Sequence, residues 1–387
     1  MLKEDKLETN INEKSLLEKN LYKISTLINN HNQTELDKFV KDLHNADLAE
    51  IIQNLDNDIR LNFILKIKQY FNPEILTYLN ESIREEVIEY LGIKQLASNA
   101  SDLDIDDAVD VLEDLVESDK EVFLNNISEI ERKLIKEGLT YPEDSAGRLM
   151  QPKFVSIDHT WNVGEAIDFL RKNKNNLPED FYEIYLHNSN NKISGTVPLG
   201  RLMGSRRVIN LQDIKNKKTR TINALTDQEE VAYQFAKYAM VSAPVINKND
   251  EIIGSITVDD VVEVIEEERE EDILKLGGVG QADIYEAVID TTKSRFSWLL
   301  VNLLTAVIAS IVISFFQASI EKVVALAVLM PIVASMGGNA GTQTLTVSVR
   351  ALATKELTTS NAFKIILKET FVGGINGIIF AIIIGFI

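Results

Sequence analysis

The last quarter of the chain contains three long stretches without a charged residue, and these stretches constrain the fold more than any other feature. About 20 helical residues, each rising about 1.5 Å, cross a hydrocarbon layer about 30 Å thick. Residues 296–316 and 323–349 are long enough to do so, and residues 370–387 nearly so. We therefore expect three membrane-spanning helices in this part of the chain.

The second uncharged stretch is too long for one straight span, since 27 residues form a helix of about 40 Å. We expect it to tilt, kink or break near Pro331 and Gly337–Gly338. Polar groups inside a bilayer are tolerated only against protein or a water-filled path. The polar side chains in the middle of this stretch should therefore face a bundle interior: Asn339, Thr342 and Gln343.

Glycine carbonyls and amide oxygens in this stretch would form a neutral, oxygen-lined wall. Such a wall suits a hard cation that keeps its hydration shell, as Mg²⁺ does. The alternative is that the small residues only let helices pack closely. Both interpretations remain open at this point.

Basic residues predict the orientation of the spans. They precede the first span and fill the segment between the second and third: Lys293, Arg295, Arg350, Lys355, Lys364 and Lys368. The positive-inside rule places this segment and residues 1–295 in the cytoplasm. The first ten residues alternate charges without an apolar core, so we expect no secretory signal. These features predict a multi-pass plasma (inner) membrane protein with cytoplasmic N-terminal domains.

The charge of the chain is concentrated in its front part. Five basic and three acidic residues lie from Phe296 onward, so the net charge of −19 leaves −21 on residues 1–295. An acidic body of this kind repels nucleic acid and attracts cations, although the same excess can serve solubility alone. The absence of cysteine excludes thiolate zinc sites, iron–sulfur clusters and disulfides.

Residues 21–140 read as short amphipathic helices with polar residues between them, which predicts an all-α superhelical N-domain after a flexible N-terminus at 1–20. Asp106 and Asp110 share one helical face. Three further acids crowd the start of the same helix: Asp102, Asp104 and Asp107. Helix capping explains one or two of these acids, but not five.

A pattern of strand, helix, two strands and helix then occurs twice, at about 141–211 and 212–272. This tandem repeat resembles an α/β pair of CBS modules. The second copy retains a G-x-x-T-x-x-D run at Gly254, Thr257 and Asp260. In the CBS pattern this acid meets a nucleotide ribose, which implies a nucleotide such as ATP at the pair. The first copy departs from the pattern, with other residues in the three places: Gly195, Pro198 and Arg201.

The second copy ends in an acidic run, residues 259–272, with nine acids and one base. Like charges one helical turn apart are destabilising. The run is therefore either a solvated face or a surface that a cation neutralises. A connecting helix at 273–295 leads from it to the first span.

The order of these parts, together with "DSAGRLM", "VDDVVEVIEEEREEDILKLGG" and "PIVASMGGNAGTQTLTVSVRALATKEL", resembles the MgtE-type magnesium channels and transporters over essentially the whole chain. The resemblance implies a homodimeric channel with five spans per subunit, in which Mg²⁺ is both the transported and the regulatory ion. It assigns the pore wall to Gly338, Asn339, Gly341 and Thr342. It assigns cytosolic Mg²⁺ sensing to Glu74, Asp106, Asp110, Glu229, Asp260, Glu263, Glu268, Glu271 and Asp272.

The chain departs from the family in two places. A family acid of the second CBS copy is replaced near Ala239, and residues 296–387 hold three of the expected five spans, which predicts a truncated transmembrane domain. The function expected is Mg²⁺ uptake through a pore that cytosolic Mg²⁺ closes. The alternative is a membrane-tethered CBS sensor of nucleotide or metal that does not conduct. No catalytic motif favours an enzyme.

Overall fold

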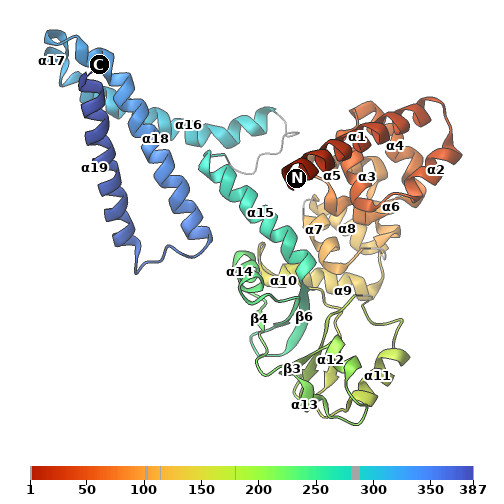
Figure 1. The fold of residues 1–387 in the computed structure, drawn as a ribbon. Helices are drawn as coiled ribbons and strands as arrows, with labels where there is room; N and C mark the ends of the chain where they lie inside the picture. Colours follow the sequence, from red (N-terminus) through yellow and green to blue (C-terminus); the bar gives the residue numbers. More distant parts are fainter. Residues whose placement is uncertain (1, 101–102, 114, 179, 280–287, 387) are drawn as a thin grey trace. The chain divides into compact units, whose positions relative to one another are not determined.

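The first part of the chain is a stack of short helices around one continuous apolar core (Figure 1). The computed structural model describes residues 2–100, 103–113, 115–178, 180–279 and 288–386. The helices of the stack are α1 (Leu2–Asn29), α2 (Gln33–Lys41), α3 (Asn45–Asn54), α4 (Asn57–Ile67), η1 (Lys68–Tyr70), η2 (Pro73–Tyr78), α5 (Glu81–Leu91), α6 (Ile93–Ser98), α7 (Ile105–Glu113), α8 (Glu117–Asn126) and α9 (Glu129–Gly138). Helix α1 covers the segment that the sequence predicted as a flexible N-terminus.

Polar residues between the apolar runs begin these helices, as their side chains satisfy backbone N–H groups that have no partner inside the helix. Asn32 caps α2, Asn72 caps η2, and Ser128 forms a capping box with Glu131 at α9. The apolar residues of α7 are buried, so its acids lie on the opposite side: Ile105, Ala108, Val109, Val111 and Leu112.

Two copies of one α/β unit follow the short helix α10 (Ala146–Leu149), and they confirm the predicted CBS pair. In each copy a parallel strand pair is extended by an antiparallel strand, giving the orders β1-β2-β3 and β4-β5-β6. The first copy contains β1 (Ser156–Asp158), α11 (Val163–Lys172), β2 (Glu183–His187), β3 (Ile193–Pro198), α12 (Leu199–Gly204) and α13 (Leu211–Ile214). The second contains β4 (Ile222–Asn223), α14 (Gln228–Tyr238), β5 (Ser242–Ile246), β6 (Ile252–Thr257) and α15 (Val258–Leu276).

The chain divides into two units, residues 1–266 and 267–387, which are described separately. The second unit contains the end of α15, then α16 (Val288–Ser314), α17 (Gln317–Lys322), α18 (Ala325–Ala353) and α19 (Ala362–Phe386). Three segments are long and apolar enough to cross a membrane: Thr291–Ser314, Ala325–Ala353 and Ala362–Phe386. The predicted connecting helix at 273–295 falls partly on residues 280–287, which lie outside the described residues.

Of the tilt, kink or break predicted near Pro331 and Gly337–Gly338, the break is wrong. Helix α18 runs without interruption over 29 residues, which corresponds to about 43 Å. Pro331 lies in the second turn, where a proline removes a single hydrogen bond to the carbonyl four residues earlier. The glycines keep negative φ angles, as they are absent from the positive-φ residues of the described chain. The long stretch is therefore one helix.

Candidate functional site

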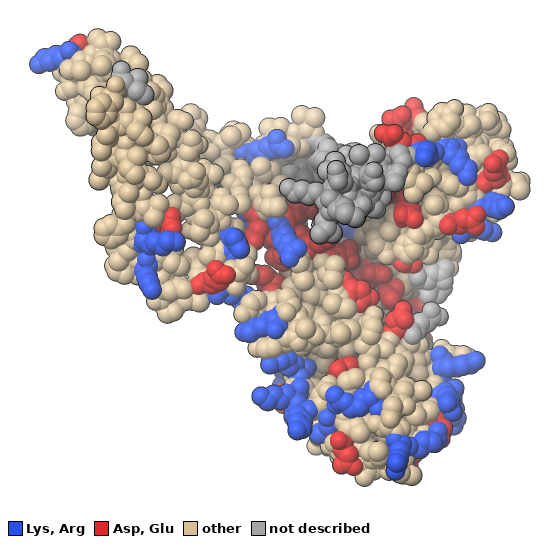
Figure 2. Space-filling view, in the orientation of Figure 1, with Lys and Arg blue, Asp and Glu red and all other residues tan. Residues whose placement is uncertain are grey.

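Carboxylates from two distant parts of the sequence meet where α7 and α15 begin. Helix α7 and the residue before it provide Asp104, Asp106 and Asp107, and the first turns of α15 provide Asp259, Asp260 and Glu263. We call these six residues the carboxylate cluster. Acidic side chains gather over this part of the first unit, whereas basic side chains are more frequent over the CBS repeats (Figure 2).

The pKa values of Asp106, Asp107 and Asp260 indicate that the carboxylates of the cluster are close together and that these three are only partly solvated. Burial raises the pKa of Asp106 well above its usual range, and Asp260, Asp107 and Asp104 raise it further. Burial, followed by Asp104 and Asp260, raises the pKa of Asp107 to about 7. Burial also raises the pKa of Asp260 to about 6, although Thr257 donates two hydrogen bonds to its carboxylate. A positive ion at this point would therefore be stabilised.

Among the described residues, one fully buried oxygen of the cluster has no hydrogen-bond partner. Asp106 Oδ1 is fully buried, and nothing in the described part of the chain donates to it. A buried carboxylate oxygen without a donor is costly. A cation or a water molecule that contacts this oxygen would replace the missing hydrogen bond.

Glu74 and Tyr78, both in η2, lie at the edge of the cluster. The carboxylate of Glu74 accepts hydrogen bonds from Asn45 Nδ2 at 2.7 Å, Asn72 Nδ2 at 3.4 Å and Tyr78 Oη at 3.4 Å. Burial, then Glu74, Asp107 and Glu263, raises the pKa of Tyr78. Tyr78 therefore stays neutral among these acids and offers one hydroxyl group to them.

Two arginines hold the remaining acids of α7. Arg84 of α5 donates from Nη1 to Asp110 Oδ2 at 2.7 Å. Arg148 of α10 donates to both carboxylate oxygens of Glu113, at 3.0 and 3.3 Å. Helix α7 is thus divided: the acids in its second half are paired with arginine, whereas no described lysine or arginine forms an ion pair with Asp106 or Asp107.

The donor chemistry of the cluster fits Mg²⁺ held through water. Mg²⁺ prefers oxygen ligands, keeps several waters and is commonly bound through one or two carboxylates. Among the described residues, no three acidic or histidine side chains converge closely enough to enclose an ion directly. The arrangement therefore suits hydrated Mg²⁺ that bridges α7 and α15 better than a fully dehydrated ion.

The structure brings some of the predicted sensing residues together and separates others. Glu74, Asp106, Asp260 and Glu263 belong to the cluster or its edge, and Asp110 lies one turn away on α7. Glu229 lies in the first turn of α14, where its backbone N–H bonds Asp227. The other three lie on the part of α15 that belongs to the second unit, where Glu271 pairs with Lys275: Glu268, Glu271 and Asp272.

Several residues of the site were not among the predicted ones. Asp104 and Asp107 were noticed only as part of an acidic helix start, and Asp102 of that group lies outside the described residues. Arg84 and Arg148 carry no local signal, because tertiary packing brings them to partners 26 and 35 residues away. Tyr78 lies four residues after Glu74, and this spacing is the one local signal that could have indicated it.

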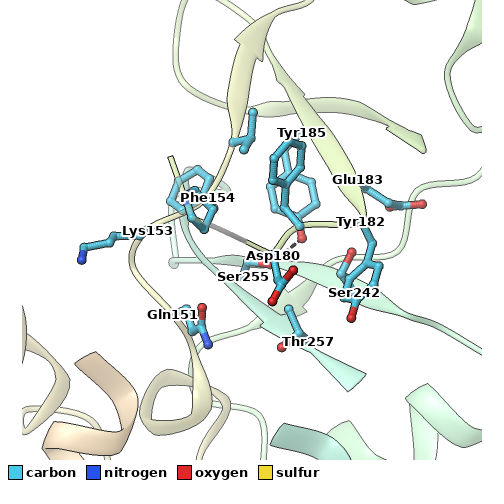
Figure 3. A pocket seen from close by; sticks show the side chains of 13 residues that line it. Gln151, Lys153, Phe154, Asp180, Tyr182, Glu183, Tyr185, Ser242, Ser255 and Thr257 are labelled. Carbon is cyan, nitrogen blue, oxygen red and sulfur yellow. Dashed lines mark hydrogen bonds between the residues drawn. The ribbon is translucent and has the colours of Figure 1, made fainter. Parts of the chain in front are cut away.

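A pocket lies between the two CBS copies (Figure 3). Its cavity volume is about 20 Å³, which is room for about one water molecule and far below the range of ligand pockets. The rings of Phe154 and Tyr185 stand 6.1 Å apart in it, and Tyr185 Oη and Ser255 Oγ are hydrogen-bonded at 2.5 Å. Thr257 and Asp180 line it as well.

The residues that were predicted to bind a nucleotide do not all line this pocket. Thr257 lines the pocket, but Asp260 accepts hydrogen bonds from Thr257 and belongs to the carboxylate cluster. Gly254 lies against Met150, whose sulfur would be 2.7 Å from an added Cβ. Arg201, in the place of an acid in the first copy, donates to the carbonyl of Ile214.

The predicted pore residues share the exposed middle of α18: Gly338, Asn339, Gly341 and Thr342. Nothing lies within 4 Å of the place where a side chain would begin at either glycine. Thr342 Oγ1 donates to the carbonyl of Gly338 at 3.1 Å. Two residues after Thr342, Thr344 Oγ1 donates to Glu369 Oε2 of α19 at 3.2 Å, so a carboxylate that was not predicted as a site residue touches the helix of the predicted pore.

Three family models match parts of the chain: "MgtE intracellular N domain" at residues 43–144, "CBS domain" at 211–267, and the MgtE model, "Divalent cation transporter", at 330–387. The CBS model matches the second copy, whereas the first copy is seen in its strand order. None of these matched families is catalytic.

Curated relatives cover most of the chain. The magnesium transporter MgtE of Thermus thermophilus is 29% identical over 349 residues, which span 89% of this chain and 77% of the relative. MgtE of Bacillus subtilis is 27% identical with the same coverage of both chains. MgtE of Enterococcus faecalis is 32% identical over 243 residues, 63% of this chain and 53% of the relative.

Solved structures agree with these matches. The soluble part of a magnesium transporter aligns with a TM-score of 0.55 at 26% identity, covering 65% of this chain and 99% of that one. The cytosolic domain of the Mg²⁺ channel MgtE in complex with ATP aligns with a TM-score of 0.53 at 25% identity, covering 59% and 92%. The predicted resemblance is therefore confirmed: the chain is a homologue of the MgtE magnesium transporters, with their helical N domain, a CBS pair and apolar helices able to span a membrane.

Proposed function

We propose that this protein conducts Mg²⁺ across a membrane and that its carboxylate cluster senses cytosolic Mg²⁺ and closes the path. The observation that carries the proposal is the meeting of Asp106, Asp107 and Asp260 across the junction of the helical domain and the second CBS copy. All three have raised pKa values, and the buried Asp106 Oδ1 has no described donor.

The gating mechanism follows from charge. With little Mg²⁺, the ionised acids of α7 and α15 repel one another, and the junction between the two domains loosens. With abundant Mg²⁺, hydrated ions bridge the two helices and hold the junction closed. A ligand shifts such an equilibrium only by its differential affinity, so several bridging ions act together.

The acids farther along α15 connect this sensor to the spans in sequence. Glu268, Glu271 and Asp272 continue the acidic face of the same helix, and Glu271 already has a cation partner in Lys275. We include them, together with Glu229, as secondary Mg²⁺ contacts. We also propose that the active form is a homodimer with its N-terminal domains in the cytoplasm.

In the membrane part, Gly338, Asn339, Gly341 and Thr342 would form the wall past which hydrated Mg²⁺ moves. The glycines leave room beside α18, and the amide and hydroxyl oxygens supply neutral ligands for the hydration shell. This arrangement requires no direct coordination of the ion by a charged side chain.

Flux into lipid vesicles tests the proposal. Vesicles that contain the full chain and a Mg²⁺-sensitive dye should take up Mg²⁺ down an inward gradient, and Asn339→Ala should slow the uptake. Vesicles that stay impermeable while the protein is folded and inserted would support the alternative, a membrane-tethered sensor that does not conduct.

A nucleotide at the CBS pair is a second candidate function, favoured by the similarity of this chain to the cytosolic domain of the Mg²⁺ channel MgtE that was solved in complex with ATP. Phe154 and Tyr185 offer aromatic faces, and Thr257 offers a hydroxyl. A nucleoside triphosphate such as ATP would have to displace the Tyr185–Ser255 hydrogen bond to enter fully. Calorimetric titration with ATP tests this, and Tyr185→Ala should change the measured affinity.

A further inference from the structure

The ion pair between Arg84 and Asp110 lies beside the carboxylate cluster and is not explained by the proposed gate. Arg84 Nη1 is 2.7 Å from Asp110 Oδ2. The arginine side chain is 12% exposed and the aspartate 60%. The guanidinium is therefore largely removed from water and has Asp110 as one of its partners, whereas the carboxylate can be reached from solvent.

The carboxylate of Asp110 cannot bind Arg84 and a divalent cation at full strength at the same time. A hydrogen bond between two charged groups is among the stronger contacts in proteins, and a buried arginine that loses its anion is destabilised. A cation that binds Asp110 must either displace the guanidinium or share one carboxylate with it at the cost of repulsion between the two positive charges.

The position of Asp110 makes this competition relevant to the cluster. Asp110 lies one turn after Asp106 on α7, and it is close enough to raise the pKa of both Asp107 and Glu113. A cation at Asp110 would thus also be near Asp107. An arginine at the same point reduces the negative potential that attracts the cation.

We infer that Arg84 is an internal competitor for divalent cations at Asp110, and that it sets the Mg²⁺ concentration at which the cluster responds. This inference rests on the proposed Mg²⁺ sensing. It assigns Arg84 a positioning role: the residue does not touch the ion but determines whether Asp110 is available to it.

The test uses the full chain in detergent, with Mg²⁺ alone as the probe and salt held constant. The readout is the Mg²⁺ concentration that gives half-maximal protection of residues 1–266 from a protease. Arg84→Gln should lower this concentration about tenfold, the effect of losing about one charge-assisted hydrogen bond.

Arg207→Gln is the control for charge, because Arg207 pairs with Asp168 of α11 at 2.5 Å on a more exposed surface, and its replacement removes the same charge. It should leave the half-maximal concentration unchanged. Equal responses of Arg84→Gln and Arg207→Gln would overturn the inference.

The Arg84→Gln substitution made in the Asp110→Asn variant separates competition for Asp110 from a general effect of removing a positive charge. In Asp110→Asn, the carboxylate for which the two cations compete is absent, so adding Arg84→Gln should change the response little. If Arg84→Gln lowers the half-maximal concentration equally with and without Asp110, competition at Asp110 is wrong.

Arg84→Lys tests the inference if Arg84→Gln does not fold. Lysine keeps the positive charge but lacks the planar guanidinium that bonds a carboxylate through two N–H groups. This variant should lower the half-maximal concentration by a smaller factor, and a value equal to that of the unmodified chain would contradict the inference. A failure of the unmodified chain to respond to Mg²⁺ at all would instead reject the proposed sensing.

Discussion

Arg148 of α10 holds the carboxylate of Glu113 in α7 by two hydrogen bonds, and this pair joins the helical domain to the segment that enters the CBS repeats. The same segment is bonded to the second CBS copy, since Gly147 N donates to Ala224 O at 2.8 Å and Ala146 N donates to Thr226 O at 2.7 Å. The junction therefore has a fixed contact that is independent of metal, next to a cluster whose closure we attribute to metal.

Replacing Arg148 by Gln should loosen this junction. The side chains of the pair are 13% and 29% exposed, and the loss of a charge-assisted contact of this kind costs about 1.5–3 kcal/mol. We expect a lower unfolding midpoint and faster protease cleavage between residues 138 and 146, with Arg148→Lys intermediate. A midpoint equal to that of the unmodified chain would show that the pair does not stabilise the junction.

The stability of the cytosolic part should depend on pH through its raised carboxylate pKa values. Asp106, Asp107, Glu113 and Asp260 all have pKa values above the ordinary range, two of them at about 7. Between about pH 4 and 7 the folded state therefore binds more protons than the unfolded state. The free energy of unfolding without Mg²⁺ should fall as the pH rises through this window and level off above it.

Denaturant titrations at several pH values measure this dependence, and Mg²⁺ should reduce it by replacing the bound protons. A stability that rises across the same window without metal would mean that the carboxylates are stabilised in their charged form by partners, contrary to the repulsion inferred here.

Asp106→Asn should remove a carboxylate whose charged form is disfavoured by burial and by its acidic neighbours, while keeping the shape of the side chain. The variant should be more stable than the unmodified chain without Mg²⁺, and it should gain less from added Mg²⁺. A gain of about 1 kcal/mol would raise the melting temperature by about 2–4 °C. Glu121→Gln is the control, because Glu121 is exposed on α8 and no described contact joins it to the cluster, and it should behave as the unmodified chain does.

Much of the fold could be predicted because it depends on local patterns. Polar residues such as Asn32, Asn72 and Ser128 mark the helix starts, and the two CBS copies repeat one order of elements with Asn-rich turns between their last strands. The length of the uncharged stretches likewise predicted the three candidate spans.

The site was predictable only in part, because its contacts depend on tertiary packing. Arg84 lies 26 residues from Asp110, and Arg148 lies 35 residues from Glu113, so no helical repeat relates them. Pro331 suggested a tilt, kink or break in α18, and the helix continues past this residue without a break. Acid composition alone could not show which carboxylates meet and which already have a cation partner.

The link between α18 and α19 predicts a role for Glu369, whose side chain is 19% exposed. Its hydrogen bond from Thr344 fixes α19 against the helix that carries the predicted pore wall. Glu369→Gln keeps a hydrogen-bond acceptor and should retain folding but slow Mg²⁺ uptake into vesicles, because a negative charge near the wall is lost. Thr344→Val should weaken the helix contact, and unchanged uptake in both variants would exclude this role.

Hydrogen–deuterium exchange tests the central claim most directly, namely that Mg²⁺ closes the carboxylate cluster. We predict that millimolar Mg²⁺ slows exchange in α7 and in the first turns of α15, compared with K⁺ at equal ionic strength. Asp106→Asn should reduce this effect. Exchange in these two helices that is the same with and without Mg²⁺ would contradict the central claim.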